Sequence, residues 1–277
     1  MMLKQFLNPP NWFTSASLFC GLYAILLAGG ANGDPAVFYK AGLMIFFAGV
    51  FDGLDGRVAR MTGTGSAFGV QLDSLVDIIS FGVAPSCLVY FWGLHAYGFA
   101  GVFVAGLLML CGAFRLARFN VTADGKAHAY SEGLTITAGG GTVASIVMWF
   151  AGRGHASAPD VRTLVILVLT VSFLEISTVP FHTTKALRRS PRTMAGLVLF
   201  AAACLAIGAR YNISTVLVII GVGHVASGPL LAAWTWPRAR RRRRAEREAR
   251  KRNPALSHEQ RSEVAETTDS TDAGSQG

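Results

Sequence analysis

Charged residues are scarce in this sequence. Only 15% of its 277 residues are Asp, Glu, Lys or Arg, whereas 52% are hydrophobic. Because a soluble domain is typically about one-quarter charged, the composition argues against a soluble globular enzyme. The apolar excess also excludes a disordered chain and a coiled coil. The protein is therefore expected to be integral to a membrane.

Cysteine is also sparse, and its placement excludes two kinds of site. No two cysteines form a C-x-x-C pair, and all of them lie inside apolar stretches. A disulfide framework or a zinc site would need paired or polar spacings. The cysteines are instead expected to pack as small apolar side chains; they are Cys20, Cys87, Cys111 and Cys204.

Long apolar runs fill most of the chain. A helix needs about 20 apolar residues to cross the hydrocarbon core of a bilayer. Eight candidate spans are present, at about 12–30, 36–57, 71–93, 97–117, 134–151, 161–178, 194–209 and 212–236. They predict an all-α integral membrane protein, a polytopic helical bundle with a six-helix core and a C-terminal pair. The first span is not expected to be a cleaved signal peptide, because seven further spans follow.

The expected domains follow from these spans. They are a membrane core at 1–187, two further helices at 188–237, and a basic then acidic disordered tail at 238–277. Residues 238–252 carry ten Lys or Arg against two Glu. This basic cluster is expected to rest on anionic lipid. Because no folded nucleic-acid-binding domain accompanies this cluster, no nucleic-acid partner is expected.

The basic residues also predict the orientation of the bundle. Lys and Arg favour the cytoplasmic side of short loops. A cytoplasmic N-terminus leaves few of them outside, namely Lys40, Arg153, Arg162 and Arg210. Eight spans return the basic tail to the same side. We therefore expect a multi-pass protein of the cell (inner or plasma) membrane with both termini cytoplasmic.

Acidic residues gather around one short loop. Asp52 and Asp55 leave the second span, and Asp73 and Asp77 enter the third. The first pair is three residues apart and the second four, so each pair lies on one helical face. Gly69 lies one turn before Asp73, which leaves room beside the carboxylates for a ligand to approach the backbone.

Four carboxylates at the edge of a membrane need a counter-charge, because they repel one another. Hard divalent cations prefer oxygen ligands, so the cluster predicts Mg²⁺ or Mn²⁺. Such ions suit a diphosphate substrate, whose leaving group they stabilise. Two other interpretations remain open: a structural set of helix caps and salt bridges, and a cation pathway through a transporter.

The pattern resembles the signature of the CDP-alcohol phosphotransferase family. The matching residues, over 26 positions, are Asp52-x-x-Asp55-Gly56-x-x-Ala59-Arg60, eight residues, then Gly69-x-x-x-Asp73-x-x-x-Asp77. The resemblance implies a membrane-embedded enzyme that moves a phosphatidyl-type group from a CDP-linked lipid to an alcohol and releases CMP. It implies a two-metal centre held by Asp52, Asp55, Asp73 and Asp77, with Asp77 also the general base. Gly56, Ala59 and Arg60 would line the CDP site.

Further stretches resemble the membrane-embedded bacterial phosphatidylserine synthases within that family. They are residues 10–14, 18–21, 72–77, 80–85 and 114–120. Ile78 follows the fourth aspartate, where glycerophosphate-accepting relatives commonly carry Lys and inositol-phosphate relatives Arg. The resemblance implies CDP-diacylglycerol as donor and L-serine as acceptor. Glycerol-3-phosphate, choline or an inositol phosphate stays open as the acceptor, and a homodimer is the expected assembly.

Polar residues outside the signature have two interpretations each. Asn11 and Thr14 are expected either to hydrogen-bond the nucleotide or to cap the first helix. Arg115 and Arg118 are expected either to clamp an anionic group of the acceptor or the lipid, or only to anchor the fourth span.

Three further features lie in the second half of the chain, outside the signature. Glu175 is expected to form a structural ion pair with Lys185 or Arg188. After residues 132–134 the synthases usually carry a proline-containing stretch, whereas this chain has Thr135-Ile136-Thr137 and then three glycines at 139–141. Residues 177–185 also lack an arginine that we would expect near their start. Either departure could change the choice of acceptor.

Overall fold

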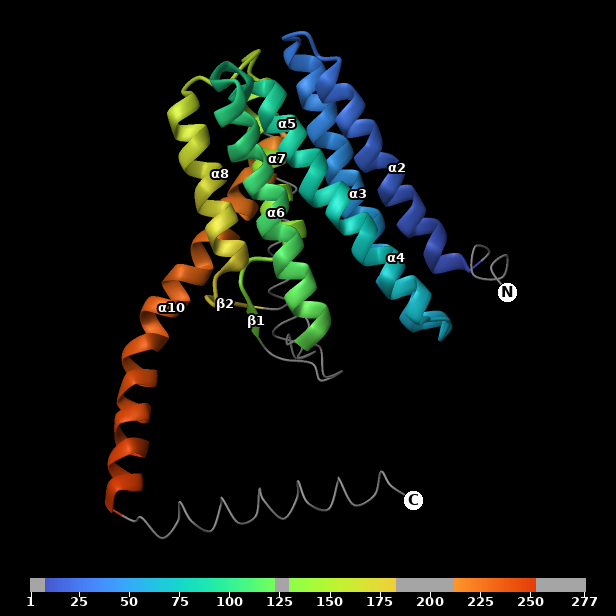
Figure 1. Ribbon diagram of the computed structural model, residues 1–277. Coiled ribbons are helices and arrows are strands. Elements are labelled where there is room, and N and C mark those ends of the chain that lie inside the picture. Colours follow the sequence, from blue (N-terminus) through green and yellow to red (C-terminus); the bar gives the residue numbers. More distant parts are fainter. Residues whose placement is uncertain (1–7, 123–129, 183–211, 253–277) are drawn as a thin grey trace. The chain divides into compact units, whose positions relative to one another are not determined.

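The computed structural model of the protein describes residues 8–122, 130–182 and 212–252. These residues are almost entirely helical (Figure 1). The elements are α2 (Pro9–Gly29), α3 (Pro35–Thr62), α4 (Ala67–Asp77), η1 (Ile78–Val83), α5 (Ala84–Trp92), η2 (Leu94–Tyr97), α6 (Phe99–Thr122), β1 (Tyr130–Glu132), α7 (Ile136–Ala151), α8 (Val161–Ile176), β2 (Pro180–His182) and α10 (Ile213–Arg252).

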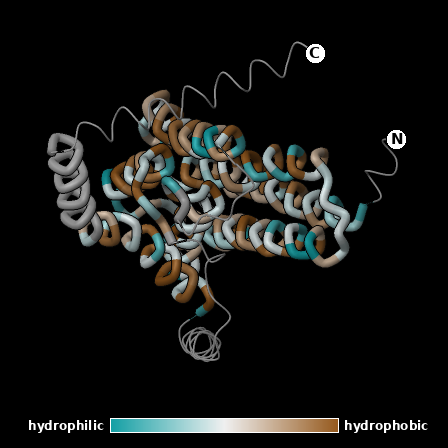
Figure 2. The backbone as a smooth tube through the Cα atoms, turned by 90° about the horizontal axis from the view of Figure 1, so that it is seen from below, coloured by the Kyte–Doolittle hydropathy of each residue, from teal (hydrophilic) through white to brown (hydrophobic). Residues whose placement is uncertain are grey.

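The predicted all-α membrane fold is confirmed. Within the described residues, five helical stretches are long and apolar enough to cross a bilayer, namely Pro9–Gly29, Pro35–Thr62, Ala67–Trp92, Phe99–Thr122 and Ile213–Trp234. Helices α7 and α8 are shorter, with 16 residues each. Hydrophobic residues, brown in Figure 2, recur along the helices. The predicted span at 194–209 lies outside the described residues.

The boundaries around the acidic loop differ from those expected. The second span was expected to end at residue 57, but α3 continues to Thr62 and ends at Gly63, whose φ of 65° is left-handed. Glycine reaches that conformation without steric cost, which makes it a common helix terminator. The third span was expected from residue 71, but α4 begins at Ala67, after Ser66 accepts a hydrogen bond from the Gly69 N–H. All four aspartates therefore lie within helices.

The first three spans pack together around the ends of α3 and α4 that carry the four aspartates. Helices α2 and α3 form an antiparallel pair, and α2 also contacts α4, η1 and α5 (Figure 1). Helix α3 packs on α7, and α6 packs on α8. The buried core between these helices contains large side chains, among them Phe38, Phe81, Trp92 and Leu108.

A π-helix, η1, follows Asp77 directly. Its Ser80 hydroxyl donates a 3.1 Å hydrogen bond to the Ser17 carbonyl of α2. Its Phe81 carbonyl lies where a Cβ on Gly140 of α7 would be. Such π-helical turns are rare and frequently occur at functional sites. This one fixes the C-terminal end of α4, and with it Asp77, against two neighbouring helices.

The chain divides into two compact units, Met1–Pro229 and Leu230–Gly277. Every residue of the candidate site lies in the first unit. The expected disordered tail needs correction for residues 238–252, because α10 continues as a helix to Arg252. Arg, Ala and Glu have high helix propensity, and they extend a helix that is already formed. Residues 253–277 lie outside the described residues, and the boundaries at 187 and 237 stay predictions.

Candidate metal centre

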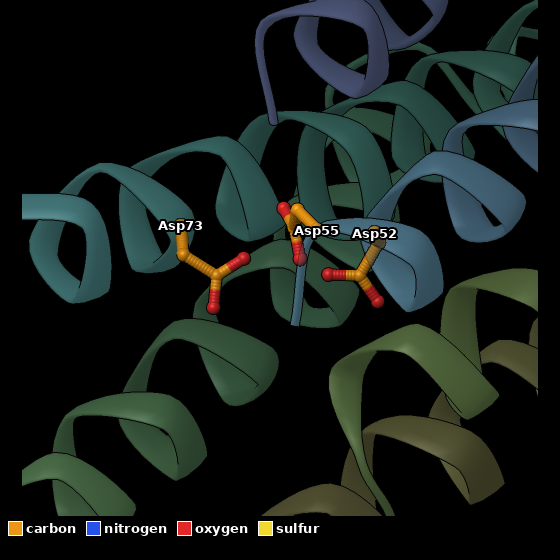
Figure 3. Close-up of side chains that lie close together, drawn as sticks. All are labelled: Asp52, Asp55 and Asp73. Atoms are coloured by element: carbon orange, nitrogen blue, oxygen red, sulfur yellow. The ribbon is translucent and has the colours of Figure 1, made fainter. Parts of the chain in front are cut away.

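Three carboxylates meet between α3 and α4. Asp52, Asp55 and Asp73 each place one carboxylate oxygen within 4.8 Å of the others. Figure 3 shows the three side chains turned toward a common space, two from α3 and one from α4. Asp55 is buried, with 7% of its surface exposed, and the other two are half-buried. The tight turn after Gly63 brings the two predicted acidic pairs together.

The fourth aspartate, Asp77, lies beside this trio. Its carboxyl group is within hydrogen-bonding reach of Asp52. Its Oδ1 atom is buried and receives no hydrogen bond. A carboxylate oxygen with no donor is free to accept a proton from a substrate. Asp77 is thus placed next to the trio with one buried carboxylate oxygen, Oδ1, that accepts no hydrogen bond.

The donor set fits a hard divalent cation. The trio offers oxygen ligands alone, which suits Mg²⁺ or Mn²⁺ better than zinc. Without a cation, these neighbouring carboxylates would repel one another in a largely desolvated place. The Arg60 guanidinium acts on Asp55, but Arg60 is exposed and a single arginine leaves a surplus of negative charge.

Thr14 connects the first helix to the trio. Its hydroxyl donates a 2.7 Å hydrogen bond to Asp55 Oδ2. The expectation that Thr14 caps the helix is wrong, because α2 begins five residues earlier, at Pro9, after the N-cap residue Asn8. Asn11 is buried on the same helix, and its Oδ1 atom is 3.3 Å from where a Cβ on Gly69 would be. Both residues face α3 or α4, next to the acidic centre.

The small residues of the signature leave space on α3. A Cβ on Gly56 would meet only the Arg60 side chain, at 3.6 Å from its Nη1 atom. Ala59 is half-buried, one turn beyond Gly56. Arg60 therefore extends across a helix face without bulky side chains, an arrangement suited to an anionic ligand.

Arg118 and Arg115 occupy different environments on α6. Arg118 donates hydrogen bonds to three main-chain carbonyls, those of Ile176 (3.0 Å), Ser177 (3.0 Å) and Glu132 (3.2 Å). Its guanidinium thus ties the end of α8 to β1, a structural role that neither interpretation of Arg118 included. Arg115 is buried and acts electrostatically on both Asp77 and Glu175.

The three glycines of α7 have different surroundings. A Cβ on Gly139 would overlap Glu175 Oε1, and one on Gly140 would overlap the Phe81 carbonyl of η1. Gly141 has no such neighbour within 4 Å and lines an apolar pocket with Gly42 and Gly221. The first two glycines therefore permit close packing beside the acidic centre.

One contact between helices was not indicated by the sequence. The Asn120 side-chain amide donates a 3.0 Å hydrogen bond to the Ser74 hydroxyl, which joins α6 to α4 beside Asp73. Both residues stand in stretches noted for their resemblance to the synthases. Nothing in their spacing pairs them, because they are 46 positions apart.

Several known proteins are similar to this chain in sequence. A Mycobacterium bovis protein named CDP-diacylglycerol–serine O-phosphatidyltransferase is 30% identical over 257 residues, 88% of this chain and 87% of that protein. A Helicobacter pylori protein of the same name is 44% identical over 115 residues, 42% of this chain and 46% of that protein. The matching region thus spans about half the length of the Helicobacter relative. An archaetidylserine synthase of Methanothermobacter thermautotrophicus is 32% identical over 181 residues, 65% of this chain and 71% of that protein.

The family itself is defined by a longer match. The sequence profile named CDP-alcohol phosphatidyltransferase matches residues 7–176. That region runs from the start of α2 to the end of α8 and includes all four aspartates. The chain therefore belongs to the CDP-alcohol phosphatidyltransferase family.

Proposed function

We propose that the protein transfers the phosphatidyl group of CDP-diacylglycerol to the hydroxyl group of L-serine, giving phosphatidylserine and CMP. The observation that carries the proposal is the meeting of Asp52, Asp55 and Asp73 within 4.8 Å, with Asp77 beside them. The names of the relatives support serine as the acceptor: two are serine phosphatidyltransferases and one is an archaetidylserine synthase.

Asp52, Asp55 and Asp73 would hold the divalent cation, Mg²⁺ or Mn²⁺, and Asp77 would complete a two-metal centre. Bound metal would neutralise charge on the diphosphate and stabilise the leaving CMP. Thr14 would keep Asp55 oriented through its hydrogen bond. Gly56, Ala59 and Arg60, together with Asn11, would form the cytidine–diphosphate site.

Asp77 would be the general base. It accepts the proton of the serine hydroxyl as the serine oxygen attacks the lipid-side phosphorus of CDP-diacylglycerol. A new phosphorus–oxygen bond forms, the bond to CMP breaks, and CMP leaves with the electron pair. The buried Oδ1 atom of Asp77 has no competing donor, so it is available for that proton.

Arg115 would receive the carboxylate of serine. Arg115 is buried and interacts electrostatically with Asp77. The Arg118 guanidinium donates to three main-chain carbonyls that join α8 to β1. A guanidinium binds a carboxylate with paired hydrogen bonds, which makes it selective for an amino acid over a simple alcohol.

The proposed setting is the cell membrane, with both termini and the acidic centre at its cytoplasmic side. CDP-diacylglycerol would keep its tails in the bilayer while serine arrives from the cytoplasm. The homodimer stays a prediction.

CMP release tests the function directly. Purified protein in detergent is given CDP-diacylglycerol and Mn²⁺ or Mg²⁺, and acceptors are added one at a time. Release with serine alone supports the proposal. Release only with glycerol-3-phosphate, choline or an inositol phosphate would replace the acceptor, and no release from folded protein would favour a transporter.

A further inference from the structure

Glu175 is a fully buried carboxylate near the inner end of α8. Its side chain has 0% exposure, and neither carboxylate oxygen has a hydrogen-bond partner. Burying a carboxylate without a hydrogen-bond partner is energetically costly. The chain nevertheless retains it in a place where an apolar side chain would pack. The proposed reaction, as described so far, gives it no role.

The neighbouring helices are shaped around this carboxylate. Glu175 Oε2 lies 3.4 Å from where a Cβ on Gly112 of α6 would be, and Oε1 lies where a Cβ on Gly139 of α7 would be. Any side chain at Gly139 would displace the carboxylate. Two glycines on different helices thus leave the space that the Glu175 carboxylate occupies.

Arg115 is the opposite charge that acts on Glu175. It stands one turn after Gly112 on α6, and it also acts on Asp77. Arg115 therefore interacts electrostatically with one carboxylate in the core of the bundle, Glu175, and with one carboxylate of the acidic centre, Asp77. Lys185 and Arg188, the expected partners of Glu175, lie outside the described residues.

We propose that Glu175 is a positioning residue that holds the Arg115 guanidinium toward Asp77, where Arg115 recognises the carboxylate of the amino-acid acceptor. This inference rests on the proposed function, since it assigns the acceptor part of the same site. Glu175 itself does not touch the substrate, because it is fully buried. Its effect is on the choice and affinity of the acceptor, not on the chemical step.

The test compares L-serine with ethanolamine, which keeps the hydroxyl and ammonium groups but lacks the carboxylate. CMP release is measured with purified full-length Glu175→Gln, which keeps the shape of the side chain and removes its charge. We expect the KM for serine to rise at least about fivefold, a coupling of about 1 kcal/mol. The kcat/KM for ethanolamine and the KM for CDP-diacylglycerol should change less than about twofold.

Two further variants separate positioning from a structural role. In an Arg115→Gln background, Glu175→Gln should add less than about a twofold change in serine KM, because its effect passes through Arg115. Ser172→Ala is the matched control, since Ser172 is a buried polar residue one turn earlier on α8; it should leave serine KM unchanged. If Glu175→Gln does not fold, Glu175→Asp replaces it as the test variant. The shorter side chain moves the carboxylate away from Arg115, so serine KM should rise as well.

The outcomes distinguish this inference from the proposed function. The inference is supported if Glu175→Gln raises serine KM in the wild-type background but not in the Arg115→Gln background. An equal loss for serine and ethanolamine, a raised KM for CDP-diacylglycerol, or fully additive effects would overturn it while leaving the function intact. Failure of the wild-type protein to release CMP with serine would instead overturn the function.

Discussion

Thr14 on the first helix donates a 2.7 Å hydrogen bond to Asp55 on the second. This bond ties the most buried carboxylate of the trio to a helix that supplies no carboxylate to it. Hydrogen-bonding partners of this kind fix the orientation of a metal ligand, and their loss commonly costs about 10–100-fold in metal affinity or activity.

Replacing Thr14 by valine tests that bond. Thr14→Val keeps the size and branching of the side chain but removes the donor, so the Mn²⁺ or Mg²⁺ concentration for half-maximal CMP release should rise about tenfold or more. Thr14→Ser is the control, because it keeps a hydroxyl and should stay near wild type. Equal metal dependence in all three proteins would remove Thr14 from the metal site.

Asp77→Asn should leave the fold intact and remove most turnover. Asparagine has nearly the same shape but cannot take the acceptor proton, and loss of a general base typically costs about 10²–10⁴-fold. Single-turnover CMP release measures the chemical step, and thermal unfolding in detergent confirms the fold. Near-normal turnover in this variant would refute the base assignment.

Removal of divalent metal should abolish CMP release reversibly. Chelation with EDTA leaves the carboxylates of Asp52, Asp55 and Asp73 without a counter-ion, so activity should fall to background. Adding back Mg²⁺ or Mn²⁺ should restore it, because hard cations suit oxygen ligands. CMP release that persists in EDTA would argue against metal assistance at this site.

Adjacent glycines on α7 should respond oppositely to alanine. A Cβ on Gly140 would overlap the Phe81 carbonyl, whereas one on Gly141 has open space within 4 Å. Gly140→Ala should therefore lower stability by about 1–3 kcal/mol through overpacking. Gly141→Ala should be neutral or gain up to about 1 kcal/mol from helix propensity. Thermal unfolding of the two variants in detergent measures both, and equal behaviour would contradict the close packing of α7 on η1.

Part of the site was predictable because it is local in sequence. Hydrophobic runs predicted membrane helices, since a bilayer leaves the backbone little choice. The spacing of Asp52 with Asp55, and of Asp73 with Asp77, placed each pair on one helical face by helix geometry alone. The oxygen-only ligand set followed from the same residues.

The remaining features depend on which helices pack together. Nothing in the spacing shows that Thr14 binds Asp55, that three carbonyls occupy Arg118, or that Glu175 lies between two glycines. These contacts join residues far apart in sequence, and their geometry is set by helix packing rather than by any repeat. The sequence by itself determined the membrane helices and the carboxylate chemistry. The tertiary structure decided which polar side chains support that chemistry and which hold helices together, because a buried polar group takes its role from the partner that packing brings to it.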